Sequence, residues 1–268
     1  MPHPLGIELL TALGMGPVEH VALAADLECR AVSMGLTQLP FNPHGYPSWS
    51  LREDAALRRE LKAVMRERGI VISIAEGMDV SAEMDASERA ADMDLFAELG
   101  ALRINSADMG VERGRAFEQF AKLAEMARER GMEFSIEFCP AFTIRNLGEA
   151  LEAVRHIGEG DATVLIDTMH FFRSGGTVRQ IAELDPALIG HARLCDAPRK
   201  GSGDYMEEAV RARMIPGEGE LPLREFVDAL PRGQRLGLEV PLFAEAESGR
   251  PARDYLAEIV TKTRDLLA

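Results

Sequence analysis

Residues 128–140 read RERGMEFSIEFCP and contain the end of one element and the whole of the next. The charged segment before Gly131 has the spacing of an amphipathic helix, and a glycine readily adopts the left-handed conformation that commonly ends one. The apolar run Met132–Glu137 follows at once and predicts a buried strand that ends on a carboxylate. RERG recurs at residues 66–69, again directly before an apolar run. The chain therefore repeats a helix-to-strand unit.

The same alternation extends along the whole chain. Short apolar runs predict strands at Gly6–Leu10, Ala31–Leu39, Ile70–Ala75, Ala101–Asn105, Met132–Glu137, Thr163–Asp167, Leu188–Leu194 and Leu236–Val240. Between them, apolar residues three and four apart predict helices, as in Arg52–Arg68, Ser87–Leu99, Val111–Arg130 and Leu147–Ile157. These repeated units predict an α/β fold, a single-domain (β/α)8 TIM barrel over residues 1–268.

Composition restricts the partners and the compartment. A formal net charge of −14 disfavours nucleic acid and anionic membrane surfaces, so we expect a small-molecule substrate. The three cysteines are far apart and form no CxxC pair, which argues against a disulfide framework or a zinc knuckle. No segment approaches the roughly 20 uninterrupted apolar residues of a membrane span, and the first residues lack a secretion signal. These features predict a cytoplasmic protein.

Three connections are longer and richer in glycine and proline than the others: Pro40–Ser50, Phe171–Gly176 with the residues after it, and Asp196–Leu221. Each follows a predicted strand and precedes a helix. In a barrel of this kind such loops lie on the C-terminal face, where active sites are built.

Carboxylates end three of the last four strands. The endings read SIEFCP, VLIDTMH, GHARLCDAP and LGLEVP, and the acidic residues are Glu137, Asp167 and Glu239. A carboxylate at the end of a buried strand needs a cation or hydrogen bonds to offset its desolvation. Separate salt bridges that hold loops would satisfy this need. Converging oxygen ligands on one face would equally suit Mg2+ or Mn2+ and acid–base chemistry.

These strand endings, together with PGEGELPL at 216–223, resemble the xylose isomerase-like barrel superfamily, which contains sugar epimerases, hydroxypyruvate isomerases and bacterial 3-dehydroshikimate dehydratases. The resemblance implies that Glu137 and Glu239 bind a divalent metal and act as the acid–base pair. It also implies that Asp167 is a further ligand and that His170, three residues later, contacts the substrate. Relatives often pair, so a homodimer is a further expectation.

The sequence departs from this pattern on the seventh strand. The position of the fourth metal ligand holds Arg193, which cannot deprotonate and is no metal ligand. Either a metal is kept by the three carboxylates while Arg193 binds a substrate carboxylate, or the guanidinium takes the metal's place and no cofactor is bound. Arg199 matches an arginine that holds the substrate's polar tail, with a solvated loop charge as the alternative. His191 lies one layer deeper, as a core histidine would.

Together with these residues, the resemblance implies an isomerase or epimerase that abstracts a proton alpha to a carbonyl of a small sugar or hydroxy-keto acid, through an enediolate. A dehydratase of the 3-dehydroshikimate type is the alternative, because loss of a beta-hydroxyl would follow the same first step. A non-catalytic small-molecule-binding barrel is the alternative of another class, suggested by Arg193. Six histidines and an acidic chain disfavour a zinc-dependent nuclease of this superfamily.

Overall fold

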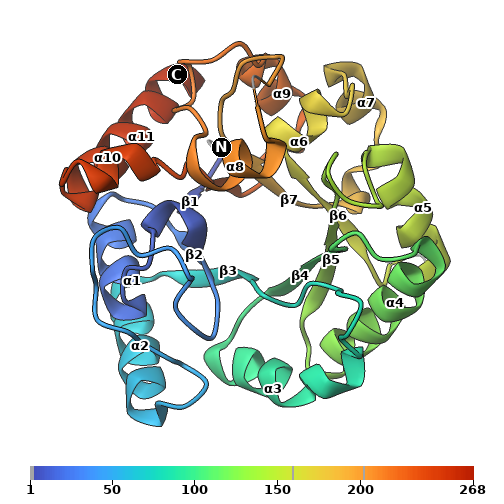
Figure 1. The fold of residues 1–268 in the computed structure, drawn as a ribbon, viewed down its shortest axis with the longest axis horizontal. Coiled ribbons are helices and arrows are strands. Elements are labelled where there is room, and N and C mark those ends of the chain that lie inside the picture. The colour runs from blue at the N-terminus through green and yellow to red at the C-terminus, as the bar shows by residue number, and fades with distance from the viewer. Residues whose placement is uncertain (1–2, 159, 202) are drawn as a thin grey trace.

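A computed structural model describes residues 3–158, 160–201 and 203–268. Within these residues, parallel strands form a closed barrel in sequence order, β1 to β8, with β8 pairing with β1 (Figure 1). The strands are β1 Leu5–Ile7, β2 Ala31–Met34, β3 Val71–Ala75, β4 Arg103–Ala107, β5 Glu133–Glu137, β6 Thr163–Asp167, β7 Ile189–Leu194 and β8 Leu236–Leu238. The predicted (β/α)8 barrel is thereby confirmed.

Helices surround the barrel and also cross its C-terminal mouth. The helices are α1 Pro17–Asp26, α2 Ala55–Arg68, α3 Ala90–Leu99, α4 Arg113–Glu129, α5 Leu147–Ile157, α6 Thr168–Arg173, α7 Val178–Glu183, α8 Tyr205–Arg211, α9 Leu223–Ala229, α10 Phe243–Glu247 and α11 Ala252–Leu267. Most of them form the outer ring, whereas α8, in orange, lies over the middle of the barrel in Figure 1. The long connection Asp196–Leu221 therefore contains a helix of its own.

Local chemistry explains where the predicted boundaries hold and where they move. Thr163–Asp167 and Leu147–Ile157 have the predicted bounds. Helix α2 begins three residues later than predicted because the Asp54 side chain accepts hydrogen bonds from two backbone N–H groups of the first turn. Gly131 has the expected left-handed conformation, with φ of 73°. The first strand is shorter than predicted, since the chain turns into a 3-10 helix at Leu9–Ala12.

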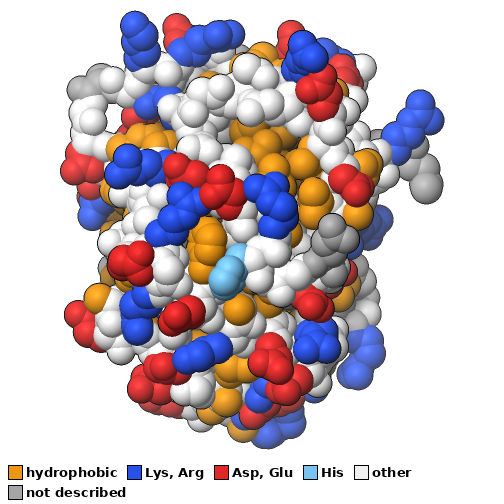
Figure 2. Space-filling view, turned by 90° about the vertical axis from the view of Figure 1, so that its right-hand side faces the viewer, with side chains coloured by type: hydrophobic (Ala, Val, Ile, Leu, Met, Phe, Trp, Pro, Cys, Tyr) orange, Lys and Arg blue, Asp and Glu red, His pale blue; other side chains and the backbone are white. Residues whose placement is uncertain are grey.

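The outer surface is charged and mixed. Figure 2 shows one side of the molecule, on which acidic and basic side chains are interspersed around small apolar areas. Among the described residues, no helix combines the length and apolar character needed to cross a membrane.

Candidate active site

The three predicted carboxylates lie together at the C-terminal end of the barrel. Glu137 ends β5, Asp167 ends β6, and Glu239 follows directly after β8. All three are buried, and one oxygen of each lies within 4.8 Å of the others. Two further carboxylates join them: Glu8 after β1 and Glu76 after β3, which form a second such group with Glu239.

Arg193 of β7 lies at the centre of this cluster. One guanidinium nitrogen, Nη1, donates to both oxygens of Glu137 at 3.0 and 2.9 Å and lies 3.3 Å from Glu239 Oε1. The other, Nη2, pairs with Glu76 and lies 3.3 Å from Glu8 Oε2. A single buried guanidinium therefore binds four carboxylates from four different strand ends.

A second arginine reaches the cluster from the connection that follows β7. Arg213 Nη1 donates to Asp167 Oδ2 at 2.5 Å, and its Nη2 lies 3.0 Å from Glu239 Oε2. Its guanidinium also donates from Nε to the carbonyl of Ala209. Arg213 is 4% exposed, so its charge is offset mainly by these two carboxylates.

Asp196 fixes the path of the connection that carries Arg213. Its carboxylate accepts hydrogen bonds from the backbone N–H groups of Ala197, Gly217 and Leu221. A Cβ at Gly219 would lie 2.3 Å from Asp196 Oδ1, so only glycine fits beside that carboxylate. The motif PGEGELPL thus wraps an aspartate and holds the segment over the barrel.

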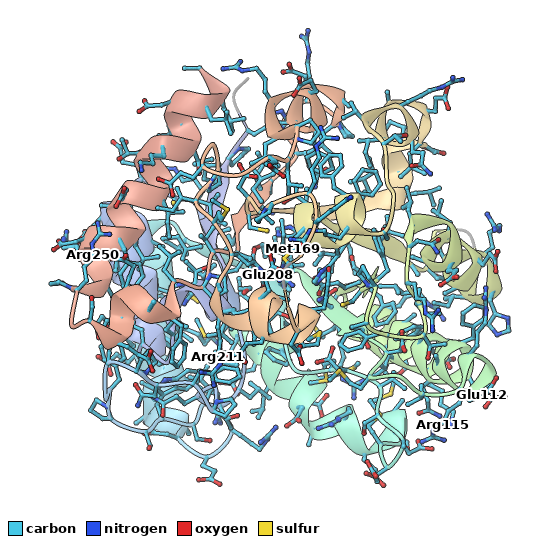
Figure 3. All side chains as sticks on the ribbon, turned by 45° about the horizontal axis from the view of Figure 1, so that its top comes forward. Glu112, Arg115, Met169, Glu208, Arg211 and Arg250 are labelled. Atoms are coloured by element: carbon cyan, nitrogen blue, oxygen red, sulfur yellow. The ribbon has the colours of Figure 1, made fainter. Side chains whose placement is uncertain are left out.

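Helix α8 is tied to neighbouring elements at both ends. At its start, Tyr205 Oη lies 2.6 Å from His170 Nδ1. Glu208 pairs with Arg173 of α6 at 2.7 Å, and the Arg211 guanidinium carbon lies 4.4 Å from the centre of the Phe243 ring. Figure 3 shows Glu208 and Arg211 on this helix, with Met169 of α6 nearby. These contacts close the barrel mouth above the carboxylates.

Of the predicted substrate-binding residues, two lie at the site and one does not. His170 is buried, and its backbone N–H donates to Asp167 Oδ1 at 3.0 Å. Arg193 is central. Arg199 is exposed, and its backbone N–H and Nε donate to Glu220 within the loop. Arg199 therefore stands outside the carboxylate cluster, as a solvated loop charge would.

Four groups of the cluster were missed at the level of sequence. Glu76 follows the apolar strand Val71–Ala75, so the rule that found Glu137 would have found it too. Glu8 was placed inside a predicted strand that in fact ends at Ile7. Asn105 of β4 donates from Nδ2 to Glu137 Oε2 at 2.7 Å. Arg213 lies in a segment without periodic pattern, and nothing around it in the sequence indicated its position.

Deeper in the barrel than Glu137, Asp167 and Glu239, Glu8 and His191 form a buried pair. His191 Nε2 lies 3.0 Å from Glu8 Oε1, and both side chains are about 1% exposed. Burial alone would raise the pKa of Glu8, but Arg193 and His191 outweigh it and lower that pKa to about 2. His191 is thus the satisfied core histidine that the sequence suggested.

The carboxylates of the upper layer differ in their proton affinity. Burial raises the pKa of Glu137 to about 7, despite the attraction of Arg193, and burial also raises the pKa of Glu239. For Asp167 the attraction of Arg213 and His170 outweighs burial, and its pKa lies below the ordinary value. Buried carboxyl groups with separated pKa values are suited to acid and base roles at neutral pH.

This pattern predicts a loss of stability as the pH rises from 6.5 to 8. Burial raises the pKa values of Glu137 and Glu76 to about 7 and about 8, so the folded state holds protons that the unfolded chain has released. Stability therefore falls as pH rises through these values. Below pH 6.5 the buried His170, with its pKa lowered to about 4, opposes this trend. Between pH 6.5 and 8 we expect a fall in unfolding free energy on the order of 2 kcal/mol.

Urea unfolding at several pH values would measure this slope. Glu137→Gln is expected to make the slope shallower, since the amide does not titrate and only Glu76 still does so in this range. Wild-type protein that becomes more stable between pH 6.5 and 8 would contradict the prediction.

The carboxylates have a spacing that a divalent cation could use, but the guanidinium groups already lie among them. Each oxygen of the trio Glu137, Asp167 and Glu239 faces an N–H group. Both oxygens of Glu137 face Arg193, and Glu239 has one oxygen facing Arg193 and one facing Arg213. The two oxygens of Asp167 face Arg213 and the backbone N–H of His170. A metal would have to displace these donors and lie beside two buried positive charges. The residues present do not fit a bound dication.

Comparison with known proteins gives a consistent family. The sequence model of the family described as "Xylose isomerase-like TIM barrel" matches residues 21–262. A curated relative, inosose isomerase of Halalkalibacterium halodurans, is 25% identical over 151 residues, which are 53% of this chain and 52% of that protein. The match thus spans about half the length of the curated relative.

Solved structures share the whole fold at low sequence identity. The structure of the IolI protein with a zinc atom superposes with a TM-score of 0.80 at 15% identity, over 98% of each chain. The probable 3-dehydroshikimate (3-DHS) dehydratase AsbF of Bacillus anthracis gives a TM-score of 0.72 at 15% identity, over 96% of this chain and 97% of that one. At these identities the likeness concerns the barrel.

Proposed function

Because the chain belongs to the xylose isomerase-like TIM barrel family, we propose that it is an isomerase or epimerase of a small sugar or hydroxy-keto acid. The reaction begins with removal of a proton from the carbon next to a carbonyl group. The electron pair of the broken C–H bond forms a carbon–carbon double bond, and the carbonyl oxygen takes the negative charge of an enediolate. Return of a proton to the neighbouring carbon, with transfer of the hydroxyl proton of the first carbon to the charged oxygen, completes an isomerisation, because the first carbon then carries the carbonyl. Return of a proton to the same carbon from the other side completes an epimerisation.

Glu137 and Glu239 are the proposed acid–base pair. The observation that carries the proposal is their position: both are buried at the mouth of the barrel and both contact Arg193 Nη1. The raised pKa of each suits a group that accepts and returns a proton near neutral pH. Asp167, with its lowered pKa, stays ionised and holds Arg213.

Positive charge for the enediolate oxygen is assigned to the arginines. Fixed guanidinium groups in a site sheltered from water stabilise a developing oxyanion. Burial alone would lower the pKa of Arg193, but the surrounding glutamates keep it well above the usual value, so the charge persists. His170, held by Tyr205, is the proposed further contact with the substrate. The alternative of an Mg2+ or Mn2+ ion on Glu137, Asp167 and Glu239 is disfavoured by the guanidinium contacts.

Glu76 is the most exposed carboxylate of the cluster. It lines a pocket of 180 Å³ together with Thr37, Gln38 and Met78, and about a fifth of its side chain is exposed. The same chemistry would serve a dehydratase, in which the enediolate expels a beta-hydroxyl. The likeness of the fold to that of the probable 3-DHS dehydratase AsbF supports this second candidate.

Exchange of substrate protons with deuterated water tests the proposal. Inosose, hydroxypyruvate and 3-dehydroshikimate are incubated with the protein, and proton NMR follows the signal next to the carbonyl. We expect exchange with one of these compounds and a decrease of roughly 100-fold or more in Glu137→Gln, because the amide cannot accept the proton. Glu118→Gln, an exposed change on α4, serves as the matched control and should keep the wild-type rate.

The outcome also separates the alternatives. Growth of the ultraviolet absorbance of a catechol acid from 3-dehydroshikimate would assign the dehydratase reaction. Exchange that is unaffected by Glu137→Gln and Glu239→Gln would rule out the acid–base pair. Binding of a compound without any exchange would favour the non-catalytic barrel.

A further inference from the structure

We infer that the guanidinium groups of Arg193 and Arg213 together occupy the cation position among Glu137, Asp167 and Glu239, and that this protein binds no divalent metal ion there. The pair carries the same charge as a dication. Unlike an ion, it is attached to the chain and cannot be exchanged or removed by a chelator.

Glu239 shows how the two arginines divide this position. Its Oε1 lies 3.3 Å from Arg193 Nη1, and its Oε2 lies 3.0 Å from Arg213 Nη2. One carboxylate thus bridges two guanidinium groups, as a metal ligand would bridge two ions. Both arginines are nearly fully buried, so water contributes little to offsetting their charge.

The remaining oxygens of the trio leave little room for a metal ion. Both oxygens of Glu137 receive hydrogen bonds from Arg193, and Asn105 donates to one of them as well. Asp167 Oδ1 accepts from the His170 backbone N–H, and its Oδ2 accepts from Arg213. A metal ion binds through oxygen lone pairs that here are directed at N–H donors, so binding would require both arginines to leave a buried position.

The second group of carboxylates also lies against cationic side chains, although Glu8 Oε2 accepts no hydrogen bond from the described residues. Glu8 Oε1 pairs with His191, and its Oε2 lies 3.3 Å from Arg193 Nη2. Glu76 pairs with the same nitrogen. Arg193 therefore lies between the two sets of oxygens that could otherwise hold an ion.

The contacts of Arg213 distinguish this inference from the simpler one that Arg193 alone excludes the metal ion. If Arg193 alone excluded the metal, restoring a histidine there would restore binding. Because Arg213 separately binds Asp167 and Glu239, we expect Arg193→His to remain largely metal-free and Arg193→His/Arg213→Leu to bind one equivalent of Mn2+ or Zn2+.

Metal content is the readout. The wild-type chain of 268 residues and the variants are incubated with Mn2+ or Zn2+, passed through a desalting column and analysed by inductively coupled plasma mass spectrometry. We expect the wild type to hold less than about 0.1 equivalent, and its melting temperature to be the same with metal and with EDTA. Circular dichroism reports whether each variant folds.

Two results would overturn the inference. One is a wild-type protein that retains a full equivalent of metal which Glu239→Gln abolishes. The other is a double variant that folds and yet binds no metal. If the double variant does not fold, the wild-type measurement decides by itself.

The consequence for catalysis rests on the proposed function: proton exchange in the wild type should be insensitive to EDTA. A protein without exchange activity and without metal would end the proposed function and leave this inference standing. Proton exchange that EDTA abolishes would support the proposed function and overturn the inference that no metal is bound.

Discussion

Replacement of Arg193 with leucine is expected to lower the free energy of unfolding by about 3–5 kcal/mol near neutral pH. The guanidinium is 3% exposed and lies within ion-pair distance of Glu8, Glu76, Glu137 and Glu239. Without it the carboxyl groups that remain ionised, Glu8 above all, lack a counter-charge, and the others must take up protons. Removing one partner of a buried ion pair costs far more than forming the pair gains, because the other partner stays buried.

The pH dependence of Arg193→Leu separates lost charge from lost packing. Acid pH should restore part of the stability, because protonated carboxyl groups need no counter-charge. Arg193→Lys keeps a positive charge and should lose less. Arg179→Leu, at a side chain that is 82% exposed, is the matched control and should change stability by less than about 0.5 kcal/mol. Equal losses in Arg193→Leu at acid and neutral pH would show that electrostatics is not the cause.

Replacement of Gly237 with alanine is the second large effect. A Cβ at this position of β8 would lie 1.7 Å from Glu8 Oε1 and 2.8 Å from His191 Nε2. The methyl group must therefore push the Glu8 carboxylate away from both His191 and Arg193, inside a layer that has no free space. Overpacking together with a displaced buried charge should cost about 3–4 kcal/mol.

Thermal unfolding would measure the effect of Gly237→Ala. For a chain of this size the loss corresponds to a fall in melting temperature of roughly 6–12 °C. Gly16→Ala is the control, because a Cβ there meets nothing within 4 Å and Gly16 does not need a left-handed backbone. A melting temperature of Gly237→Ala equal to that of the control would show that Glu8 relocates freely.

Much of the barrel is readable in the sequence because each unit has a local cause. Apolar runs of strand length, helical spacing of three and four, and helix-ending glycines such as Gly69 and Gly131 act within a few residues. The strand ends were least well predicted where the chain turns early, as after Ile7, where a 3-10 helix replaces the end of the predicted strand. Such a turn depends on packing against distant parts of the chain, and the local sequence pattern does not show that packing.

By itself, the sequence determined that Glu137, Asp167 and Glu239 converge, because parallel strands of one barrel end on one face. The resemblance of the strand endings to the xylose isomerase-like superfamily also implied that Arg193 stands beside them, at the position of the fourth metal ligand. Only the tertiary structure decided what balances their charge. Arg213 meets Asp167 across 46 positions of chain, and Glu8 meets His191 across 183. Such pairs form because burial makes an unpaired charge costly, and that requirement becomes specific only once the barrel has closed.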